Sequence, residues 1–586
     1  MTAATSTSMR AIASICALLR LRFGARPPIT ATFALWAAFC LVCAPAKLAE
    51  KGRPRQTHRR SGGEHSKIAA LPHPSMSRDV FHLDVSRADL TLAVIGAGVM
   101  GRGIAQIAVQ AGIRVLLYDN RAGAAQGAKD SVSQQLLRLV DKGRLKSDDA
   151  DKAIGKLIVA DSLQPLSACQ IVIEAIAENL DAKRELFRSL EPIVADDCLI
   201  ASNTSSLQIT AIAAACRRPE RVGGFHFFNP VPLMKVVEVV DGLLTASWVG
   251  EALTALALRC GHKPVRAKDT PGFIVNHAGR AYGTEALRIL GEGIAEFHEI
   301  DRILRDAAGF RLGPFELFDL TGLDVSHPVM ESIYHQYYEE PRYRPSPLTG
   351  QRVAAGLLGR KSGRGFYRHE DGKQEEIPER TAPTARPERV WVSRAGLGMK
   401  LAERVARLGA SIDGGARPAA HSLCLVAPLG RDATTTAVED GLDPARTLAV
   451  DCLFSTEKRR TLMATPLTTP AMRAAAHGLL ASDGVPVSMI GDSPGFVAQR
   501  VIAQIVNIAS DIAQQRIASP EDIDSAVMLG LGYPRGPLAW GDAIGAPRIL
   551  AILDALQDFY GDPRYRASPW LKRRARLGVS LLTAEA

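Results

Sequence analysis

A histidine and a glutamate twelve residues apart are the pair in this sequence best suited to proton transfer. His226 and Glu238 each lie in a short apolar segment of strand length, at 223–228 and 236–240, and the Asn-Pro-Val-Pro segment at 229–232 favours a turn between them. Such a turn would bring Glu238 back towards His226. A histidine can accept a hydroxyl proton near neutral pH, and a carboxylate on its other ring nitrogen would orient the imidazole. The pair is therefore a candidate base and partner for oxidising a secondary alcohol.

Three further polar residues, Ser205, Asn229 and Asn276, are candidates for contacting substrate oxygens. Each of them serves equally well as a turn or cap residue when taken alone. His226 between aromatic residues would, by itself, more often be a structural histidine in a core. The paired acid, and the position after a nucleotide-binding pattern, favour catalysis instead.

A glycine-rich turn predicts a dinucleotide site. Residues 92–95 form an apolar run of strand length, Gly96, Gly98 and Gly101 follow as G-x-G-x-x-G, and apolar residues then recur at helical spacing. In such a turn the first glycine permits the tight bend, the second lets the backbone approach a pyrophosphate, and the third lets the helix pack against the strand. The N–H groups at the helix start then face the phosphates.

An acidic residue after the next strand indicates which dinucleotide is bound. Asp119 ends the apolar segment 114–119, which follows the helix that begins after Gly98. It can accept hydrogen bonds from ribose hydroxyls and would repel a 2′-phosphate. The expected cofactor is NAD rather than NADP.

Strands and helices alternate beyond this point. Apolar runs at 157–159, 171–173 and 199–201 are separated by helical stretches. This order predicts an α/β fold with a mainly parallel sheet covered on both faces. Ligands would gather beyond the strand C-termini, where Glu174, Glu178 and residues 202–206 are expected.

Five segments, in this order and spacing, resemble the 3-hydroxyacyl-CoA dehydrogenase family, and the resemblance extends over residues 92–325. They are VIGAGVMGRGIA from Val94, VIEAIAENLDAK from Val172, ASNTSSLQIT from Ala201, GFHFFNPVPLMKVVEVV from Gly224 and DTPGFIVN from Asp269.

The resemblance implies a fold, an activity and a set of site residues. The fold is a Rossmann-type NAD-binding domain followed by an all-α domain like that of 6-phosphogluconate dehydrogenase. The activity is reversible, NAD-dependent oxidation of a 3-hydroxyacyl-CoA to a 3-oxoacyl-CoA, as in fatty-acid β-oxidation, butyrate or phenylacetate catabolism. The site residues it implies are catalytic His226 and Glu238, substrate-binding Ser205, Asn229 and Asn276, and cofactor-binding Asp119, Glu178 and Lys183.

The acyl chain stays open between 3-hydroxybutyryl-CoA and 3-hydroxyadipyl-CoA. Pocket shape would decide it, and a basic residue at the far end of the acyl chain would favour the dicarboxylate. Two rival functions also remain: another NAD-dependent hydroxyacid dehydrogenase that uses a lysine, and a non-catalytic NAD-binding protein.

The C-terminal half repeats part of the first half in degenerate form. The Asp-Thr-Pro-Gly-Phe segment from Asp269 recurs as Asp-Ser-Pro-Gly-Phe from Asp492, and the same offset places Gln499 opposite Asn276. Before it, Val390-Trp391-Val392 and the glycines at 396 and 398 resemble a decayed strand-turn-helix unit. No His-Phe-Phe-Asn segment follows, and residues 454–457 occupy roughly that place. We expect one working site, in the first half.

Shorter family members pair two helical domains across a dimer, so the second copy can supply that partner within one chain. The protein is expected to be either a monomer with an internal pseudo-dimer or a homo-oligomer. The expected boundaries are an N-terminal extension at 1–85, an NAD-binding domain at 90–268, a helical domain at 269–370, a linker at 371–388, a degenerate Rossmann-like domain at 389–490 and a second helical domain at 491–586.

Composition argues against other classes of partner. The net charge is +10, but residues 1–75 hold 11 Lys and Arg against 2 Asp and Glu, whereas the rest of the chain holds 60 against 59. Bulk charge therefore predicts no nucleic-acid binding. The nine cysteines include no pair of CxxC motifs and no His/Cys cluster at metal spacing, so no metal is expected.

The N-terminus resembles a secretory signal. Arginines at 20, 22 and 26 precede an apolar run at 31–46 that ends in Ala-Pro-Ala, which is shorter than a membrane span requires. Export from the cytoplasm would conflict with a reaction that uses NAD and a CoA thioester, because both are kept in the cytoplasm. We therefore expect translation to start at Met76, a cytoplasmic enzyme without a membrane segment, and an extension that is disordered or not native.

Overall fold

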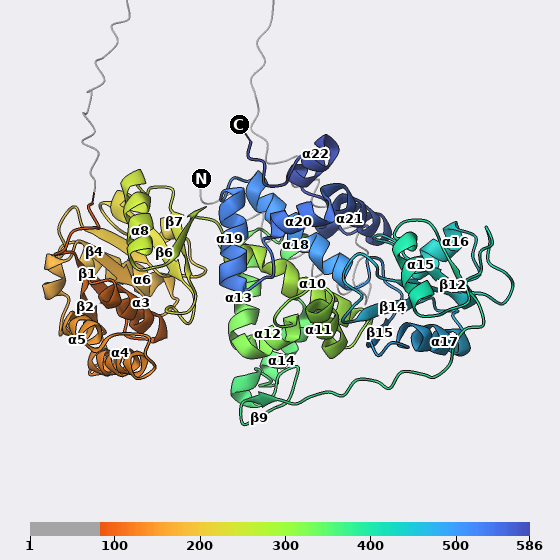
Figure 1. Ribbon diagram of the computed structural model, residues 1–586. Coiled ribbons are helices and arrows are strands. Elements are labelled where there is room, and N and C mark those ends of the chain that lie inside the picture. Colours follow the sequence, from red (N-terminus) through yellow and green to blue (C-terminus); the bar gives the residue numbers. More distant parts are fainter. Residues whose placement is uncertain (1–82, 586) are drawn as a thin grey trace, which may run out of the picture. The chain divides into compact units, whose positions relative to one another are not determined.

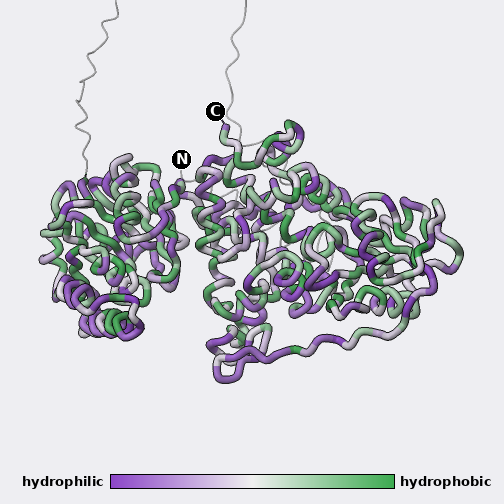
Figure 2. The backbone as a smooth tube through the Cα atoms, viewed as in Figure 1, coloured by the Kyte–Doolittle hydropathy of each residue, from purple (hydrophilic) through white to green (hydrophobic). Residues whose placement is uncertain are grey.

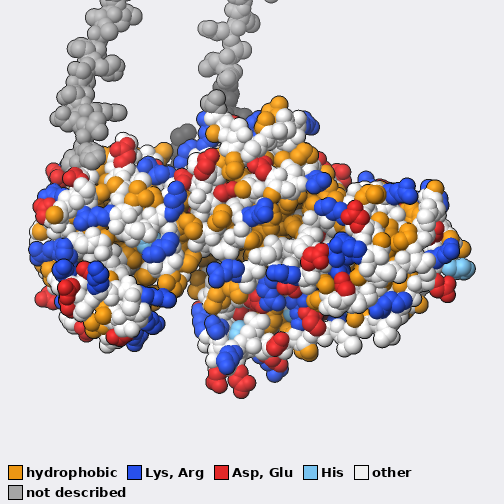
Figure 3. Space-filling view, in the orientation of Figure 1, with side chains coloured by type: hydrophobic (Ala, Val, Ile, Leu, Met, Phe, Trp, Pro, Cys, Tyr) orange, Lys and Arg blue, Asp and Glu red, His pale blue; other side chains and the backbone are white. Residues whose placement is uncertain are grey.

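The computed structural model describes residues 83–585 (Figure 1). The signal-like segment at 20–46 and the expected start at Met76 lie outside the described residues. Among the helices described, none combines the length and apolarity that a membrane crossing requires. On the face shown in Figure 3, basic and acidic side chains are interspersed rather than segregated.

Eight strands form the first sheet, in the order β3-β2-β1-β4-β5-β6-β7-β8. Neighbouring strands run parallel except for β6 and β7, which are antiparallel. The strands are β1 (Thr91–Ile95), β2 (Arg114–Tyr118), β3 (Leu157–Val159), β4 (Ile171–Glu174), β5 (Leu199–Ser202), β6 (Val222–Phe227), β7 (Val236–Asp241) and β8 (Lys263–Lys268).

Helices cover both faces of this sheet. Ala93 and Ile95 of β1 enter one hydrophobic core, whereas Leu92 and Val94 enter another, so successive residues of the strand are buried on opposite faces. This two-sided burial explains why the strands are continuous apolar runs. The predicted Rossmann-type fold is confirmed. The helices are α3 (Val99–Gln110), α4 (Ala124–Asp141), α5 (Ser147–Gly155), α6 (Leu180–Leu190), α7 (Ile209–Ala213) and α8 (Ser247–Arg259).

A helical region follows β8. It ends in a short hairpin of β9 (His369–Glu370) and β10 (Lys373–Gln374). Residues 375–388 beyond the hairpin contain no helix or strand, and they are predominantly hydrophilic (Figure 2). The helices are α9 (Val275–Ala278), α10 (Arg280–Gly291), α11 (Phe297–Asp306), α12 (Pro314–Thr321), α13 (Leu323–Gln336) and α14 (Pro347–Ala354).

The second sheet is a shortened version of the first. Its order is β11-β12-β13-β14-β15, and only β13 and β14 are antiparallel, as β6 and β7 are in the first sheet. Three of the eight strands of the first sheet therefore have no counterpart within 389–490. The elements are β11 (Val390–Val392), α15 (Gly398–Arg407), β12 (Leu423–Val426), α16 (Ala433–Glu439), β13 (Thr447–Val450), β14 (Arg460–Ala464), α17 (Pro470–Leu480) and β15 (Val487–Ile490).

The second helical region repeats the first in detail. Phe273 and Phe496 both take a left-handed backbone, with φ of 47° and 51°, and each follows a glycine with positive φ. Helix α18 packs along α10, which joins the two copies. The predicted duplication is therefore present in the backbone. The helices are α18 (Ala498–Gln514), α19 (Pro520–Leu531), α20 (Pro537–Ile544), α21 (Ala546–Tyr560) and α22 (Pro569–Leu577).

Candidate active site

His226 and Glu238 face each other across the antiparallel pair β6 and β7. They are direct partners in its register, and the chain reverses between them at 228–235. Partners in an antiparallel pair project to the same face of the sheet. The imidazole Nδ1 lies 2.5 Å from Glu238 Oε2, and both side chains are buried. Because an ionised carboxylate only accepts hydrogen bonds, Nδ1 carries the ring proton and donates it to Glu238.

Backbone groups at the start of α9 fix the second oxygen of Glu238. Oε1 accepts the N–H of Ile274 at 2.9 Å and of Val275 at 2.8 Å. These donors follow Phe273, whose left-handed backbone turns the chain into α9. With the bond from His226, the buried carboxylate accepts three hydrogen bonds, which offset much of its desolvation. Glu238 is thereby locked in position and holds the imidazole in turn.

The other ring nitrogen of His226 is left for a ligand. Among the described residues nothing hydrogen-bonds to Nε2. The rings of Phe228 and Phe273 lie 4.5 Å and 5.8 Å from the imidazole, centroid to centroid, and shield it on two sides. A nitrogen with an unprotonated lone pair in this setting can accept a proton from a bound hydroxyl.

Asn276 and Ser205 lie together beside the pair. The Asn276 side-chain amide donates to the Ser205 carbonyl at 3.3 Å, and Asn276 lies one residue after Val275, which donates to Glu238. Asn229, three residues after His226, is exposed and lines the cavity described below. The structure thus brings Asn276 and Ser205 into direct contact.

Glu178 organises the loop that carries Ser205. Its Oε1 accepts the backbone N–H groups of Ser205 and Ser206 at 2.8 and 2.9 Å and the Thr204 hydroxyl at 2.7 Å. Burial acts to raise the pKa of Glu178, but Lys183 and these donors lower it below its ordinary value. The carboxylate is therefore charged near neutral pH and holds the loop in one conformation.

Lys183 is held by two carboxylates beneath this loop. Its ammonium, almost fully buried, lies 2.5 Å from Glu174 Oε1 and 3.5 Å from Glu178 Oε2. Ser202 at the end of β5 donates to the other oxygen of Glu174 at 2.6 Å. Lys183 therefore acts by supporting Glu178, because its own ammonium is enclosed by protein.

The glycine turn has the geometry that a pyrophosphate requires. A Cβ on Gly96, which has a φ of 103°, would lie 2.5 Å from the Ala175 carbonyl oxygen, and one on Gly101 would lie 1.8 Å from the Gly96 carbonyl oxygen. A Cβ on Gly98 would meet no protein atom within 4 Å, so this glycine borders open space. The turn is tight at Gly96 and Gly101 and open at Gly98, which fits a bound dinucleotide.

Asp119 is anchored to the same turn. Its Oδ2 accepts the Ala97 N–H at 2.8 Å, and Oδ1 accepts the Arg121 N–H at 2.9 Å. Burial acts to raise the pKa of Asp119, but these bonds and the Arg121 guanidinium lower it below its ordinary value. The negative charge needed to bind ribose hydroxyls is therefore present.

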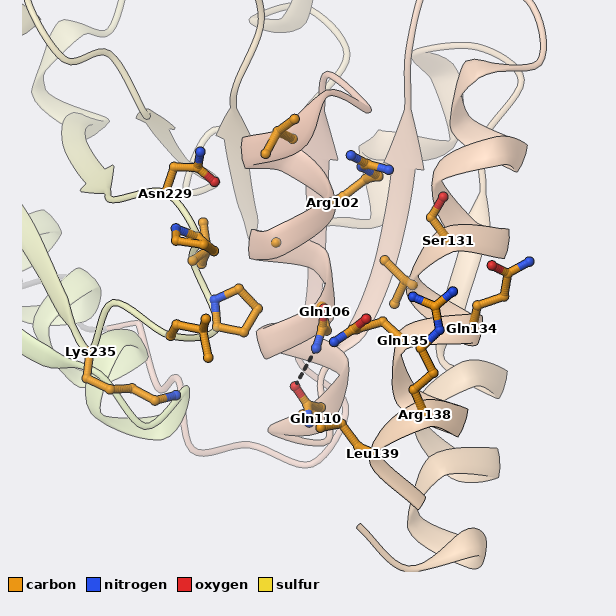
Figure 4. A pocket seen from close by; sticks show the side chains of 17 residues that line it. Arg102, Gln106, Gln110, Ser131, Gln134, Gln135, Arg138, Leu139, Asn229 and Lys235 are labelled. Carbon is orange, nitrogen blue, oxygen red and sulfur yellow. Dashed lines mark hydrogen bonds between the residues drawn. The ribbon is translucent and has the colours of Figure 1, made fainter. Parts of the chain in front are cut away.

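A cavity of about 540 Å³ opens next to the turn after β6. Helices α3 and α4 form two of its walls and residues 229–235 form the third, and Figure 4 shows polar side chains directed into it from all three. Arg102, Arg138 and Lys235 contribute three positive charges, and the other polar lining residues are mostly glutamines. The sequence did not single out this site, because its residues come from three segments that are distant from one another in the chain.

The second copy lacks a counterpart of the His226–Glu238 pair. In its antiparallel pair β13–β14, Val450 faces Leu462 with the same twelve-residue spacing as His226 and Glu238. The prediction that residues 454–457 stand in the histidine segment's place was wrong, because the strand pairing places that position at Val450. Gln499, opposite Asn276 in the duplication, donates to the buried Asp451 at 2.9 Å. These positions are filled by protein contacts.

The contacts of two residues in the site could not be inferred from the sequence. Glu174 ends β4 and binds both Lys183 and Ser202, and Gln336 of α13 donates to the Ser206 carbonyl at 3.2 Å. An acid at a strand end was visible in the sequence, but its partners were not. Gln336 lies 130 residues from Ser206, and only the fold brings them together.

Comparison with family models covers both halves of the chain. The model described as 3-hydroxyacyl-CoA dehydrogenase, NAD binding domain, matches residues 91–270. The model described as 3-hydroxyacyl-CoA dehydrogenase, C-terminal domain, matches twice, at 272–369 and 495–580. The two matches begin at the same offset as the duplicated segments from Asp269 and Asp492.

Similar proteins carry related names. A 3-hydroxyadipyl-CoA dehydrogenase of Escherichia coli K12 is 39% identical over 83% of this chain and 98% of its own length. The human mitochondrial hydroxyacyl-coenzyme A dehydrogenase is 39% identical over 47% of this chain and 90% of its own. A crystal structure of 3-hydroxybutyryl-CoA dehydrogenase from Escherichia coli K12 superposes with a TM-score of 0.74, at 38% identity, over 83% of this chain and 98% of that one. The chain belongs to the 3-hydroxyacyl-CoA dehydrogenase family.

Proposed function

We propose that His226 is the proton acceptor in the family's reaction, the reversible oxidation of a 3-hydroxyacyl-CoA to a 3-oxoacyl-CoA. NAD, when bound, accepts the hydride from C3 of the substrate. The hydroxyl proton passes to Nε2 of His226 and from there to water, so the balance is one NADH and one proton for each alcohol oxidised. In the reverse direction the imidazolium returns the proton to the substrate oxygen.

The observation that carries this proposal is the contact between Nδ1 of His226 and Glu238 at 2.5 Å. A carboxylate there holds Nε2 unprotonated before the reaction and stabilises the imidazolium that forms. The two backbone donors to Glu238 keep that carboxylate in place while the charge on the ring changes. The pair is thus arranged before substrate arrives, which lowers the reorganisation needed in the transition state.

Asn276 is proposed to orient the substrate next to this base. A primary amide has two N–H donors, and the Ser205 carbonyl takes one of those of Asn276. The other can donate to a substrate oxygen. Ser205 and Asn229 are proposed as further substrate contacts, Ser205 from the loop held by Glu178 and Asn229 from the rim of the cavity.

The coenzyme portion of the thioester is proposed to occupy the cavity between α3 and α4. Coenzyme A carries several phosphate charges and a long apolar and amide arm, and the cavity combines Arg102, Arg138 and Lys235 with glutamines and exposed apolar side chains. Cationic side chains bind phosphates by charge-assisted hydrogen bonds. The cavity also begins at Asn229, three residues after the proposed base.

Two finer proposals for the substrate, 3-hydroxybutyryl-CoA and 3-hydroxyadipyl-CoA, differ in the length and the end group of the acyl chain. Both names occur among the similar proteins of Escherichia coli. A panel of 3-hydroxyacyl-CoA thioesters of increasing length, including the adipyl form, tests them with NAD and NADP compared. We expect NAD to be the better cofactor with every thioester.

A His226→Gln variant tests the proposed base. We expect kcat to fall by roughly 100- to 10,000-fold, the range that general-base catalysis contributes, while NADH binding measured by fluorescence stays unchanged. Undiminished activity in this variant would indicate a dehydrogenase that uses another base, such as a lysine. A wild-type protein that binds NADH but does not oxidise it with acetoacetyl-CoA would be a non-catalytic NAD-binding protein.

The coenzyme site has its own test. In Arg138→Ala we expect KM for acetoacetyl-CoA to rise about tenfold or more, as loss of a charge-assisted bond predicts. With acetoacetyl-N-acetylcysteamine, which lacks the phosphates, KM should not change. An equal rise in KM for both thioesters would contradict the placement of coenzyme A in this cavity.

A further inference from the structure

Arg280 is a partly exposed cation one helical turn beyond Asn276. The two residues are four positions apart, and Gly279 between α9 and α10 keeps helical dihedrals, so their side chains lie on the same face. The Arg280 Nε donates to the Asn276 carbonyl at 2.7 Å. Among the described residues, no carboxylate pairs with Arg280, and no group hydrogen-bonds to its two terminal nitrogens.

Two neighbouring arginines, unlike Arg280, have a buried counter-charge. Arg500 and Arg564, which lie on the α18 side of the contact with α10, both pair with the buried Glu285 of α10. Arg280 has no such counter-charge among the described residues. Burial lowers the pKa of Arg280 to about 10, and the Tyr533 phenol acts in the opposite direction. A partly desolvated guanidinium without a counter-charge is unfavourable in the free protein and is relieved when an anion binds.

Tyr533 reaches this place from the second helical copy. Its hydroxyl is buried and has no hydrogen-bond partner among the described residues. Its ring packs against Phe310 at 5.0 Å and Tyr282 at 5.7 Å between centroids. Leu531, two residues earlier, lies against Gly279 immediately before Arg280. A free hydroxyl and an unpaired guanidinium therefore lie in one region next to Asn276.

The duplication provides an internal comparison for this pair. By the offset that relates Asn276 to Gln499, Arg280 corresponds to Ala503 and Tyr533 corresponds to Phe310. The equivalent place beside Gln499 thus has an alanine and a phenylalanine, both apolar. The cation and the hydroxyl occur together only on the side that carries Asn276 and His226, which favours a role in ligand binding over a role in the interface.

We propose that Arg280 and the Tyr533 hydroxyl bind the terminal carboxylate of a dicarboxylic 3-hydroxyacyl thioester. This inference rests on the function proposed above, and it makes the second helical copy part of the substrate site. Four residues of helix span about 6 Å, and the three carbon bonds from C3 to C6 of a six-carbon chain span about 4 Å. A chain whose C3 lies at Asn276 therefore brings its far carboxylate within reach of the Arg280 side chain.

The test compares two thioesters that differ only at C6: 3-hydroxyadipyl-CoA, which ends in a carboxylate, and 3-hydroxyhexanoyl-CoA, which ends in a methyl group. The readout is the ratio of their kcat/KM values with NAD. We expect the wild type to favour the adipyl form. In Arg280→Met the ratio should fall roughly 10- to 100-fold, as loss of a charged hydrogen bond predicts, and Tyr533→Phe should lower it by about 3- to 10-fold.

Two further variants keep the test decisive. Arg535→Met removes an exposed arginine two residues from Tyr533 and should leave the ratio unchanged. Arg280→Lys keeps the charge but not the planar fork, so it should retain part of the preference. Should Arg280→Met lose activity with both thioesters, Arg280→Lys and Tyr533→Phe decide the question by their ratios.

The outcomes separate this inference from the proposed function. An unchanged ratio in Arg280→Met, or in both Arg280→Lys and Tyr533→Phe, overturns it, as does a wild type that uses the two thioesters equally well or prefers the hexanoyl form. Any of these results leaves the dehydrogenase activity in place. A wild type that oxidises neither thioester contradicts the proposed function itself.

Discussion

Replacing Glu238 by glutamine tests how His226, the proposed base, is held. The amide has the shape of the carboxylate, but it offers one acceptor and one donor instead of two acceptors. The acceptor must face the N–H groups of Ile274 and Val275, which lie 2.9 and 2.8 Å from Oε1 in the wild type. The amide NH₂ then faces Nδ1 of His226. That ring nitrogen must become the acceptor, so the ring proton moves to Nε2, where it blocks the proposed base.

The contacts at Glu238 set the size of this effect. In the opposite amide orientation the NH₂ would face two backbone donors, and each unsatisfied buried donor costs about 1–3 kcal/mol. The combined penalty of about 2–6 kcal/mol keeps the acceptor towards α9 in most molecules. In a comparable carboxylate–histidine site, holding the imidazole in the wrong tautomer lowers kcat by about four orders of magnitude. We expect a loss of about 1,000- to 10,000-fold here, which corresponds to about 4–5 kcal/mol.

Steady-state oxidation of a 3-hydroxyacyl-CoA, followed by NADH absorbance, measures this loss. NADH binding by fluorescence should stay at the wild-type level, because Glu238 lies outside the glycine turn. The double variant Glu238→Gln/His226→Gln should be no slower than His226→Gln alone, because both changes disable one unit. Activity in Glu238→Gln within tenfold of wild type, or losses that multiply in the double variant, would refute the reasoning.

Three other predictions follow from the charges. Asp119→Ser should raise kcat/KM with NADP relative to NAD by about tenfold or more, because the repulsive carboxylate is gone and Arg121 remains beside the site; an unchanged ratio would contradict this. Burial raises the pKa of Asp451 from 3.8 to about 6, so the folded state loses stability as pH rises through that window. Asp451→Asn should therefore be more stable than wild type at pH 8, by up to about 3 kcal/mol. At pH 3.5 the two proteins should be equally stable. If thermal unfolding shows the same gain at both pH values, the raised pKa of Asp451 is not its cause. Arg500→Met leaves Glu285 buried beside one fewer cation, so it should lower the free energy of unfolding by about 3–5 kcal/mol. An unchanged melting temperature would argue against a stabilising role for that ion pair.

The main features of the first sheet were predictable because they depend on local patterns. An apolar run of strand length from residue 92, the glycines at 96, 98 and 101 and the acid at 119 follow each other closely in the chain, and each fixes its own backbone geometry. The pairing of His226 with Glu238 was also predictable, since a short turn joins two strands and sets their register.

The environment of those residues could not be predicted in the same way. Glu238 is held by the start of α9, 36 residues further along, and Lys183 is enclosed by carboxylates from two other segments. The sequence placed residues 454–457 in the histidine segment's position of the second copy, but strand pairing assigned that position to Val450. A degenerate repeat keeps its backbone pattern after its side-chain identities have changed, so a sequence pattern alone misplaces single residues.

The sequence by itself determined the nucleotide fold, the pairing of His226 with Glu238 and the duplication, because each is encoded in residues close together or in a repeated spacing. Only the tertiary structure decided which groups have partners. Arg280 and Tyr533 belong to different copies of the duplicated region, and nothing in either segment indicates that one lacks a counter-charge and the other a hydrogen bond among the described residues. Whether a buried polar group is satisfied depends on every segment packed around it, and that is fixed only when the whole chain has folded.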